Sequence, residues 1–392
     1  MRLVYLDHAA TTPPLPEVAD AMEPFLREKF GNPSALYALG RESREAVEHS
    51  RRRVASLIGA SPEEIYFTSG GSESDNMALW GALLASGGRG GHLVTTAVEH
   101  HAVLDTTFFL KGQGYGITVV GVDSHGMVDP DDIRRAIRGD TVVVSVMHAN
   151  NEVGTIEPVR EVAEVCREAG VYLHTDAVQT VGNIPVNVDE LKVDMMSMSS
   201  HKLYGPKGVG AIYIRQGTRV SKIIHGGEQE SGMRAGTENI AGIVGFGVAC
   251  EAAVREMPEK VKRISALRDR LVEGVLGSID DVSLSGHPED RLPNNAHFRV
   301  GYIEGEAICL QLDTFGICAS TGSACTSEAL EPSHVLLAMG VKGPEAHGSL
   351  RMTLGRGTTA EDIEYVLEKL PPVVARLRSM SPLAKRAKRG QT

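Results

Sequence analysis

The sequence predicts an α/β protein with a mainly parallel, seven-stranded sheet between helices, followed by a smaller α+β part. Two observations support this fold class. Between residues 65 and 214, short runs rich in Val, Ile and Thr alternate with amphipathic helical stretches, a pattern typical of strands joined by right-handed helical crossovers. A long helical stretch then runs from about residue 240 to 276, and the alternation after it is different.

The chain length indicates two domains. At 392 residues the chain is longer than one ordinary hydrophobic core. We expect the boundary within the long helical stretch, near residue 255. Residues 16–255 then form the large domain, and residues 1–15 and 256–392 form the small one.

The first elements can be justified in chain order. Residues 7–14 are too rich in turn residues for a long element. A helical pattern runs from Glu17 to Phe30 and is broken by a Gly-Asn-Pro turn, and Arg41 to Ile58 follows as an amphipathic helix with arginines on its wet face. The alternating region predicts strands at 65–68, 92–96, 116–122, 141–147, 172–174, 193–198 and 210–214, and helices at 72–84, 101–110, 130–137 and 159–169.

Boundary residues support the later elements. Asp129 precedes Pro130, an N-cap followed by proline at the first helical position. After the long helix, residues 282–285 and 295–300 have the pattern of antiparallel strands, and another helix follows from Glu304. In an open parallel sheet, ligands bind where the loops gather at the carboxyl ends of the strands.

Composition and charge exclude several classes of protein. The net charge of −10 argues against nucleic-acid binding. Five widely spaced cysteines form neither a disulfide framework nor a CxxC metal site. The first residues lack a signal-peptide core, and no apolar run reaches the roughly 20 residues needed to span a membrane. We therefore expect a soluble, cytoplasmic protein that binds neither nucleic acid nor membrane. The basic run at 385–390 is read as a solvated end.

The chemistry is organised around Lys202. This lysine follows the buried strand 193–198 and a Ser-Ser-His run, and it precedes a Gly-Pro turn. A lysine at the end of a core strand is desolvated, which lowers its pKa and makes it a nucleophilic amine. That is what a Schiff base with an aldehyde cofactor such as pyridoxal phosphate requires. A surface lysine in a turn is the alternative, and the surrounding residues decide between them.

Other predicted strands are followed by residues that suit the pyridine ring and the phosphate of such a cofactor. Asp176 ends a strand and can pair with the pyridine nitrogen, although an aspartate there can also cap a helix. Gln179 can donate to the phenolic oxygen. A glycine turn at a helix N-terminus is suited to phosphate, and it also resembles an ordinary capping box. The candidate phosphate donors are Gly71, Ser72, Ser199 and His201.

Four further residues are candidates for contact with cofactor or substrate. His100 can stack on a cofactor ring and handle protons; the neighbouring His101 does not make the pair a zinc site, because adjacent side chains diverge. Asn151, in a polar turn, can contact cofactor or substrate. Arg351 and Arg356 stand at the two ends of a short predicted strand, and either can bind a carboxylate bidentately, with Arg351 preferred. No metal is expected.

Cys325 is the candidate nucleophilic thiol. It lies in a run of small residues from 319 to 327, where a thiol is exposed rather than packed in the core. Such a loop would also let the thiol move between an active site and another protein. The other cysteines stand among apolar residues or in helices and are read as core residues: Cys166, Cys250, Cys309 and Cys318.

These motifs resemble the cysteine desulfurases of the iron–sulfur cluster assembly and nitrogen-fixation type, in the class V aminotransferase superfamily with fold-type I. The resemblance covers nearly the whole chain. It is carried by 67–76 (FTSGGSESDN), 174–179 (HTDAVQ), 200–208 (SHKLYGPKG) and 322–327 (GSACTS). The sequence departs from the usual family pattern at His8, Tyr37 and Ser231.

The resemblance implies a role for each matching residue. Lys202 would carry pyridoxal phosphate covalently, Arg351 would meet the carboxylate of L-cysteine near Asn32 and Asn151, and Cys325 would receive the sulfur as a persulfide. Thr237 would reach the phosphate from the partner subunit, so a homodimer is implied. Sulfur acceptors such as an iron–sulfur scaffold would be further partners.

Other readings remain. A selenocysteine lyase or an aminotransferase of the same fold would share the cofactor residues, although transamination needs no thiol. A non-catalytic scaffold would not need Lys202 or Asp176. A nucleotide-binding protein would need the GxGxxG or GxxxxGK[ST] patterns, which the sequence lacks.

Overall fold

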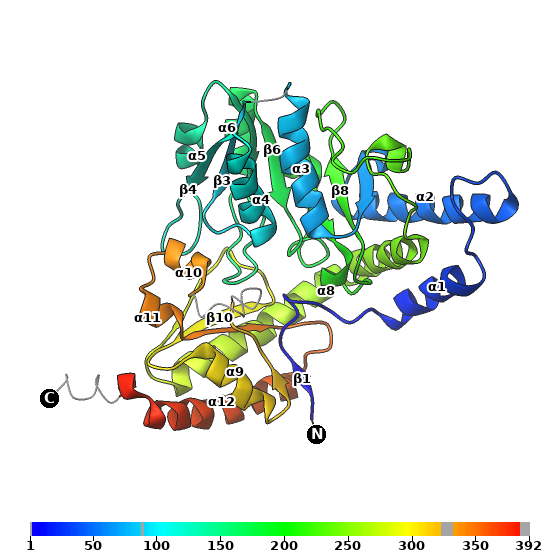
Figure 1. The fold of residues 1–392 in the computed structure, drawn as a ribbon. Helices are drawn as coiled ribbons and strands as arrows, with labels where there is room; N and C mark the ends of the chain where they lie inside the picture. Colours follow the sequence, from blue (N-terminus) through cyan, green and yellow to red (C-terminus); the bar gives the residue numbers. More distant parts are fainter. Residues whose placement is uncertain (1, 88–89, 323–331, 385–392) are drawn as a thin grey trace.

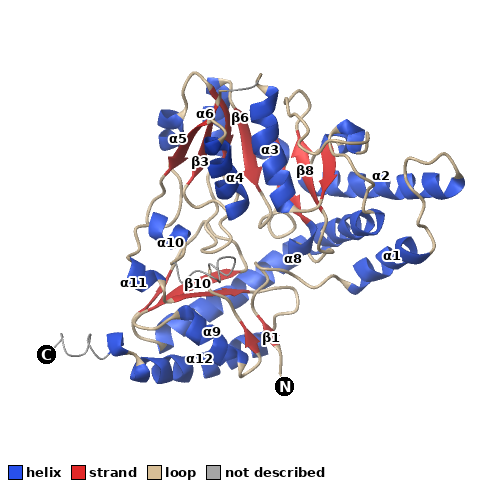
Figure 2. Ribbon diagram, viewed as in Figure 1, coloured by secondary structure: helices blue, strands red, loops and turns tan. Residues whose placement is uncertain are grey.

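The computed structural model describes residues 2–87, 90–322 and 332–384. Its centre is a seven-stranded sheet with strand order β2-β8-β7-β6-β5-β3-β4. All neighbouring strands are parallel except at β8, which runs antiparallel to both β7 and β2. Helices cover both faces of this sheet (Figures 1 and 2). The predicted α/β fold with a mainly parallel sheet is confirmed.

The large sheet and its helices have the following bounds. The strands are β2 (Ile65–Thr68), β3 (His92–Thr96), β4 (Gly116–Val120), β5 (Thr141–Ser145), β6 (Tyr172–Asp176), β7 (Met195–Ser199) and β8 (Gly210–Ile214). The associated helices are α1 (Pro16–Arg27), α2 (Ala38–Ile58), α3 (Gly71–Ala85), α4 (His101–Gly112), α5 (Pro130–Ala136), α6 (Val159–Ala169) and α7 (Val188–Leu191).

Alternation along the strands builds two cores on the two faces of the sheet. In β5, Val143 packs in one cluster with α3 and α4, and Val144 packs in the other with α2 and α6. Met195 and Met196 of β7 divide in the same way. Successive side chains of a strand point to opposite faces. The continuous apolar runs of these strands therefore reflect burial on both sides.

The C-terminal part has its own sheet and core. The three-stranded antiparallel sheet has the order β12-β10-β9, and a further two-stranded pairing joins β1 to β11. The elements are β1 (Val4–Tyr5), α8 (Ile240–Ser278), β9 (Val282–Leu284), β10 (Asn295–Val300), α9 (Gly305–Asp313), β11 (Ile317–Cys318), α10 (His334–Ala338), α11 (Gly343–Ala346), β12 (Ser349–Thr353) and α12 (Ala360–Met380).

Helix α8 joins the two parts. Its first half contributes Phe246 and Cys250 to a core beside the large sheet, and its second half contributes Leu271 and Val275 to the C-terminal core. Pro258 lies inside the helix between these contacts. The domain limits at residues 15 and 255 remain a prediction.

Most element boundaries lie within a few residues of their predicted positions. The bounds of β2, β3, α6, β8 and β10 match the prediction. Asp129 caps α5, since its side chain accepts from the Asp131 amide. The prediction that the first helix reaches Phe30 was wrong, because α1 ends at Arg27 and the two following amides bond back to Pro24. None of the helices among the described residues is long and apolar enough to cross a membrane.

Candidate active site

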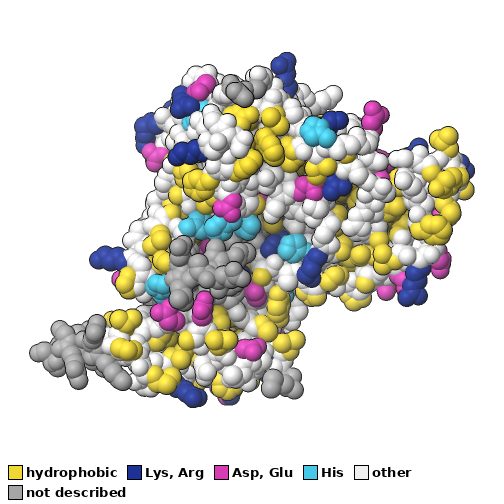
Figure 3. Space-filling model, viewed as in Figure 1, with side chains coloured by type: hydrophobic (Ala, Val, Ile, Leu, Met, Phe, Trp, Pro, Cys, Tyr) yellow, Lys and Arg dark blue, Asp and Glu magenta, His cyan; other side chains and the backbone are white. Residues whose placement is uncertain are grey.

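A cavity of about 300 Å³ lies where the large sheet meets the C-terminal part. Figure 3 shows histidine side chains gathered near the middle of this face, between the two parts of the molecule. Most of the predicted site residues line the cavity together. Its lining consists of Ala9, Ala10, Gly71, Ser72, Asp75, His100, Met147, Asn151, Asp176, Val178, Gln179, Ser199, His201, Lys202, Gly322 and Arg351.

A hollow of about 430 Å³ lies elsewhere, on the large part of the molecule. Its lining includes an ion pair in which Nη1 of Arg51 lies 2.8 Å from Oε2 of Glu230, and it contains no lysine among the described residues. The smaller cavity is the one that holds a lysine and buried carboxyl groups together. We therefore take that cavity as the candidate active site.

Lys202 enters the cavity from the turn that follows β7. The strand ends at Ser199, and a single 3₁₀ turn over Ser200–Lys202 carries the lysine out of the sheet. Its Nζ donates to the carbonyl oxygen of Ala9 at 2.6 Å and to that of Ala10 at 2.7 Å. The predicted position at the end of a buried strand agrees with this geometry.

The N-terminal segment forms one wall of the cavity. Thr12 fixes it, since its Oγ1 donates to the His201 carbonyl at 2.8 Å and accepts from the Tyr204 amide at 2.8 Å. Gln179 also bonds to this segment through Nε2, which donates to the Ala9 carbonyl at 3.0 Å. The sequence predicted Gln179 at the site but gave no role to residues 9–12.

Asp176 is the last residue of β6 and is only 5% exposed. Its Oδ1 accepts from the Val178 amide at 2.9 Å. Burial raises the pKa of Asp176, while its electrostatic interactions with His100 and Lys202 act to lower it. No helix begins directly after Asp176, so the alternative reading as a helix cap was wrong.

Behind Asp176 lies a buried polar group that sequence reasoning missed. Asp75 of α3 is 1% exposed, and its Oδ1 lies 3.6 Å from Nε2 of His174 without a hydrogen-bond partner among the described residues. Burial, and next the charge of Asp176, raise the pKa of Asp75 well above its usual value. His174 bonds through its two nitrogens to Ser145 and Ser197, each at 2.9 Å. The spacing of four residues from Gly71 was a usable signal, because it places Asp75 on the same helix face.

The N-terminus of α3 forms a suitable anion site. Gly71 and Ser72 begin this 15-residue helix, so free backbone amides and the positive end of the helix dipole face the cavity. A Cβ on Gly71 would lie 2.7 Å from Cγ2 of Val178 and 3.8 Å from Cβ of Ser199, so the close approach requires glycine. Ser199 and His201 line the same cavity. Burial, with Lys202 nearby, lowers the pKa of His201 to about 4, so this ring is neutral near pH 7.

His100 caps α4 and lines the cavity. Its Nδ1 accepts from the Ala102 amide at 3.1 Å, which assigns the proton of the neutral ring to Nε2. Burial lowers the pKa of His100, with the Asp176 charge opposing. The ring is thus a neutral aromatic surface with one N–H, as stacking and proton transfer require.

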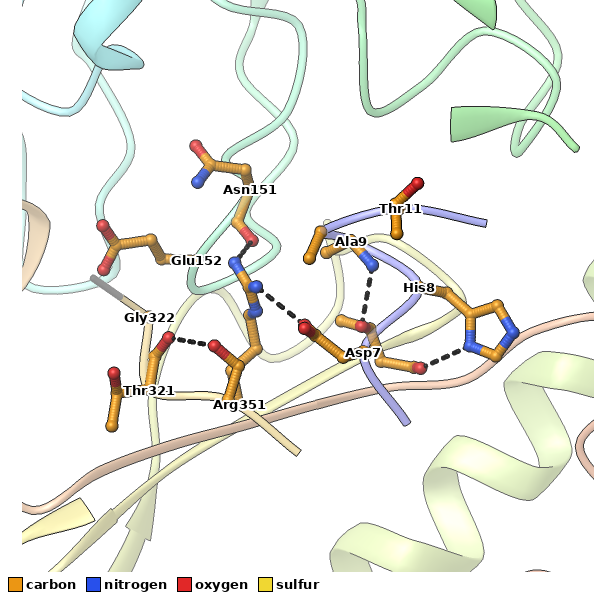
Figure 4. A network of polar contacts seen from close by, with 12 residues as sticks. Asp7, His8, Ala9, Thr11, Asn151, Glu152, Thr321, Gly322 and Arg351 are labelled. Carbon is orange, nitrogen blue, oxygen red and sulfur yellow. Dashed lines mark hydrogen bonds and ion pairs between the residues drawn. The ribbon is translucent and has the colours of Figure 1, made fainter. Parts of the chain in front are cut away.

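Arg351 lies at the C-terminal side of the cavity (Figure 4). The sequence predicted it at the end of a strand, but it is the middle residue of β12, paired with His297 of β10. Nη1 donates to the Asn151 carbonyl at 2.9 Å, and Nη2 donates to Oδ1 of Asp7 at 2.9 Å. Arg356 instead pairs with Glu256 at 2.9 Å and does not line the cavity. The geometry therefore favours Arg351.

Two predicted residues do not line the cavity of this single chain. Asn32 is exposed, and its Oδ1 accepts from the Ser34 amide at 2.9 Å. Thr237 is exposed, and neither residue lines the cavity. Cys325 lies outside the described residues, although Gly322, three positions earlier, lines the cavity. Among the residues described, no group of three or more His, Cys, Asp or Glu side chains is arranged to hold a metal ion.

The four described cysteines are poor nucleophiles. Burial is the largest cause in every case, raising the pKa of Cys166 and of Cys309 to about 12 and raising that of Cys250 and Cys318. Cys166 and Cys250 are buried, as predicted for core residues. Cys309 is partly buried and packs against the C-terminal core, whereas Cys318 is partly buried and belongs to none of the hydrophobic clusters of the described residues.

The chain is similar to known proteins over nearly its whole length. Residues 4–366 match the family model described as Aminotransferase class-V. The chain is 55% identical over 381 residues to "Cysteine desulfurase IscS" of Dictyoglomus turgidum, covering 97% of both chains. Among solved structures, "NIFS-LIKE PROTEIN" matches with a TM-score of 0.90 and 39% identity, covering 96% of this chain and 100% of that one. A structure titled "SspA in complex with cysteine" matches with a TM-score of 0.80 and 34% identity, covering 90% and 98%.

Proposed function

Because this chain belongs to the aminotransferase class-V family, we propose that it is a pyridoxal phosphate-dependent cysteine desulfurase, converting L-cysteine to L-alanine and carrying the sulfur as a persulfide on Cys325. The observation that supports this most is the meeting of Lys202, Asp176 and Arg351 in one cavity. Relatives that match over nearly the full chain bear the name cysteine desulfurase.

The side chains present fit pyridoxal phosphate. Lys202 is an amine at the cavity for the aldehyde, Asp176 is a buried carboxyl for the pyridine nitrogen, and the α3 N-terminus with Gly71 and Ser72 can hold the phosphate. Ser199, His201, Gln179 and Asn151 add polar groups to the same lining. When bound, the cofactor supplies an electron sink that stabilises negative charge on the substrate's α-carbon.

The residues of this chain supply binding and proton transfer. Arg351 binds the substrate carboxylate through those N–H groups that Asp7 and Asn151 leave available. Lys202 Nζ takes and returns the α-proton, because it stands on the short turn beside the cavity. His100, which lines the cavity, would contact the cofactor and exchange protons through Nε2. Asn32 and, from a partner subunit, Thr237 complete the proposed contacts.

The sulfur transfer is assigned to Cys325. Its thiolate attacks the substrate's Sγ, an S–S bond forms and the Cβ–S bond breaks, and the released carbon skeleton takes up a proton to become alanine. Cysteine and the Cys325 thiol thus give alanine and the Cys325 persulfide, so no outside oxidant is needed. A free thiol requires a reducing compartment, so we propose the cytoplasm.

Two partners are proposed beyond the substrate. A second copy of the chain would bring Thr237 to the phosphate site, because Thr237 does not line the cavity of its own chain. A sulfur acceptor, such as a scaffold for iron–sulfur cluster assembly, would take the persulfide sulfur. The name IscS on the relatives supports the second proposal.

The test measures both products of the holoprotein with L-cysteine and a reductant. Equal amounts of alanine and sulfide are expected. C325S should keep the cofactor absorbance and lose sulfide formation, while the matched variant C318S should keep both. Sulfide production by C325S at the unmodified rate would refute the role of Cys325, and a cofactor band without sulfide in the unmodified protein would favour an aminotransferase.

A further inference from the structure

An ion pair between Asp7 and Arg351 lies at the edge of the candidate active site (Figure 4). Oδ1 of Asp7 is 2.9 Å from Nη2 of Arg351, and the arginine side chain is 4% exposed against 21% for the aspartate. The two residues are 344 positions apart in the chain. The arginine that is proposed to receive a carboxylate therefore already contacts one.

The backbone on both sides fixes Asp7 in this position. Val4 and Tyr5 form β1, paired with β11, and Leu6 is completely buried. The Leu6 carbonyl accepts from the Thr353 amide at 2.7 Å, and Asp7 itself forms a β-bridge with Thr353. The Asp7 carboxylate is thus held against β12, which carries Arg351, and does not reach it through a flexible loop.

The arginine retains donors for a second acceptor. A guanidinium has five N–H groups, and the hydrogen bonds to Asn151 and Asp7 use one on each terminal nitrogen. Nε is buried and has no partner among the described residues. A substrate carboxylate can therefore join Asp7 on the same guanidinium, and the two anions would then lie close to each other.

Asp7 is the anion paired directly with Arg351. Lys202, another cation of the cavity lining, donates to the carbonyl oxygens of Ala9 and Ala10. His100 and His201 are neutral near pH 7, since burial lowers the pKa of each. A carboxylate at Arg351 consequently meets a cation whose charge Asp7 partly neutralises.

We propose that Asp7 sets how tightly the Arg351 site holds an amino-acid carboxylate, orienting the guanidinium while weakening the site enough for the product to leave. This inference rests on the proposed role of Arg351 in binding the substrate carboxylate. Asp7 is a positioning residue in this scheme, because it acts through the arginine. Its effect falls equally on substrate and product, which carry the same carboxylate.

The variant D7N isolates the charge, because the amide oxygen of asparagine can still accept from Arg351. We expect the D7N holoprotein to bind L-alanine about tenfold more tightly, because a close negative charge is removed. For the same reason, its KM for L-cysteine should also decrease. Binding is measured by titrating L-alanine and following the cofactor absorbance, and KM and kcat come from initial rates. The matched control is D313N, which changes the same charge at an exposed residue of the C-terminal part; it should leave both constants unchanged.

The variant R351Q distinguishes a failure of this proposal from a failure of the proposed role of Arg351. R351Q should weaken L-alanine binding, and adding D7N to it should then change binding less than D7N does alone, because the part of its effect that acts through the arginine is lost. If R351Q binds L-alanine normally, the proposed role of Arg351 is wrong and the role of Asp7 is overturned with it. If R351Q weakens binding but D7N leaves it unchanged or weaker, Asp7 alone is overturned. Thermal unfolding of each variant reports folding, and D7S replaces D7N if D7N does not fold.

Discussion

The ammonium group of Lys202 donates a 2.6 Å hydrogen bond to the carbonyl oxygen of Ala9, a residue 193 positions earlier in the chain. The carbonyl of Ala10 accepts a second one at 2.7 Å. Both acceptors are backbone carbonyls, so a side-chain substitution does not remove them directly. The contact therefore depends on where the N-terminal segment lies. Whatever holds that segment in place also positions the lysine.

Thr12 is the residue that tests this dependence. T12V keeps the shape of the side chain but removes the hydroxyl, so the Tyr204 amide loses its partner and the His201 carbonyl keeps only the Thr12 amide, at 2.9 Å. We expect a loss of about 1–3 kcal/mol in the free energy of unfolding, together with a reduced kcat. Denaturant unfolding and initial rates measure the two. The exposed T314V is the comparison, since Thr314 bonds only within its own turn; equal losses in both variants would contradict the role of Thr12.

Asp176 should matter for rate more than for cofactor retention. D176N removes the negative charge from a buried position beside Lys202 and His100. In the proposed site a neutral amide could not keep the pyridine nitrogen protonated, so kcat should fall by roughly 100-fold or more while pyridoxal phosphate is retained. The rate of alanine formation measures kcat, and the absorbance of the purified variant measures how much pyridoxal phosphate is retained. A D176N enzyme of normal kcat would show that another group serves the nitrogen.

Gly71 should be intolerant of even one methyl group. In G71A the new Cβ would meet Cγ2 of Val178 at 2.7 Å, so α3 or the turn after Asp176 must shift. We expect pyridoxal phosphate to bind about tenfold more weakly, because the amides at the helix N-terminus move with it. Equilibrium dialysis of the cofactor is the measurement. G112A, where no atom lies within 4 Å of the added Cβ, is the control.

The buried Glu157 should make the free energy of unfolding decrease as the pH rises. Burial raises the pKa of Glu157 to about 8. Between about pH 4.5 and 8 the folded protein holds a proton that the unfolded chain releases, so its contribution to stability declines as pH rises through this range. E157Q mimics the neutral form and should remove a decline on the order of 3 kcal/mol between pH 5 and pH 8.

The measurement is the unfolding free energy of both proteins at pH 5, 6.5 and 8. The exposed Glu161 offers a matched control, because E161Q makes the same chemical change on the surface of α6. Parallel pH profiles for E157Q and the unmodified protein would show that Glu157 is not protonated in the folded state.

The large sheet could be predicted closely because its signals are local. Val143 and Val144 stand in a continuous apolar run bounded by turn residues, and such a run indicates a strand buried on both faces wherever it occurs. The meeting of Lys202 and Asp176 in one cavity could be predicted for a related reason. In a parallel sheet, residues that end neighbouring strands meet at one edge, so their positions follow from the strand assignments.

The contacts of Asp7 could not be predicted, because they depend on where a short N-terminal segment crosses the fold. Asp7 stands in a turn-rich stretch with no periodicity, and its partner Arg351 follows 344 residues later. Asp75 was missed for a different reason. Its carboxyl is buried within a helix whose sequence was read only for its first turn.

Helix α8 sets the angular relation between the two halves of the site. At 39 residues it is one continuous element of about 58 Å, and both hydrophobic cores pack on it. Each residue of an α-helix turns the chain by about 100°. One residue inserted between Phe246 and Leu271 would therefore rotate the C-terminal core, and Arg351 with it, by that angle relative to Lys202. The number of residues in this helix therefore determines how Arg351 is oriented relative to Lys202.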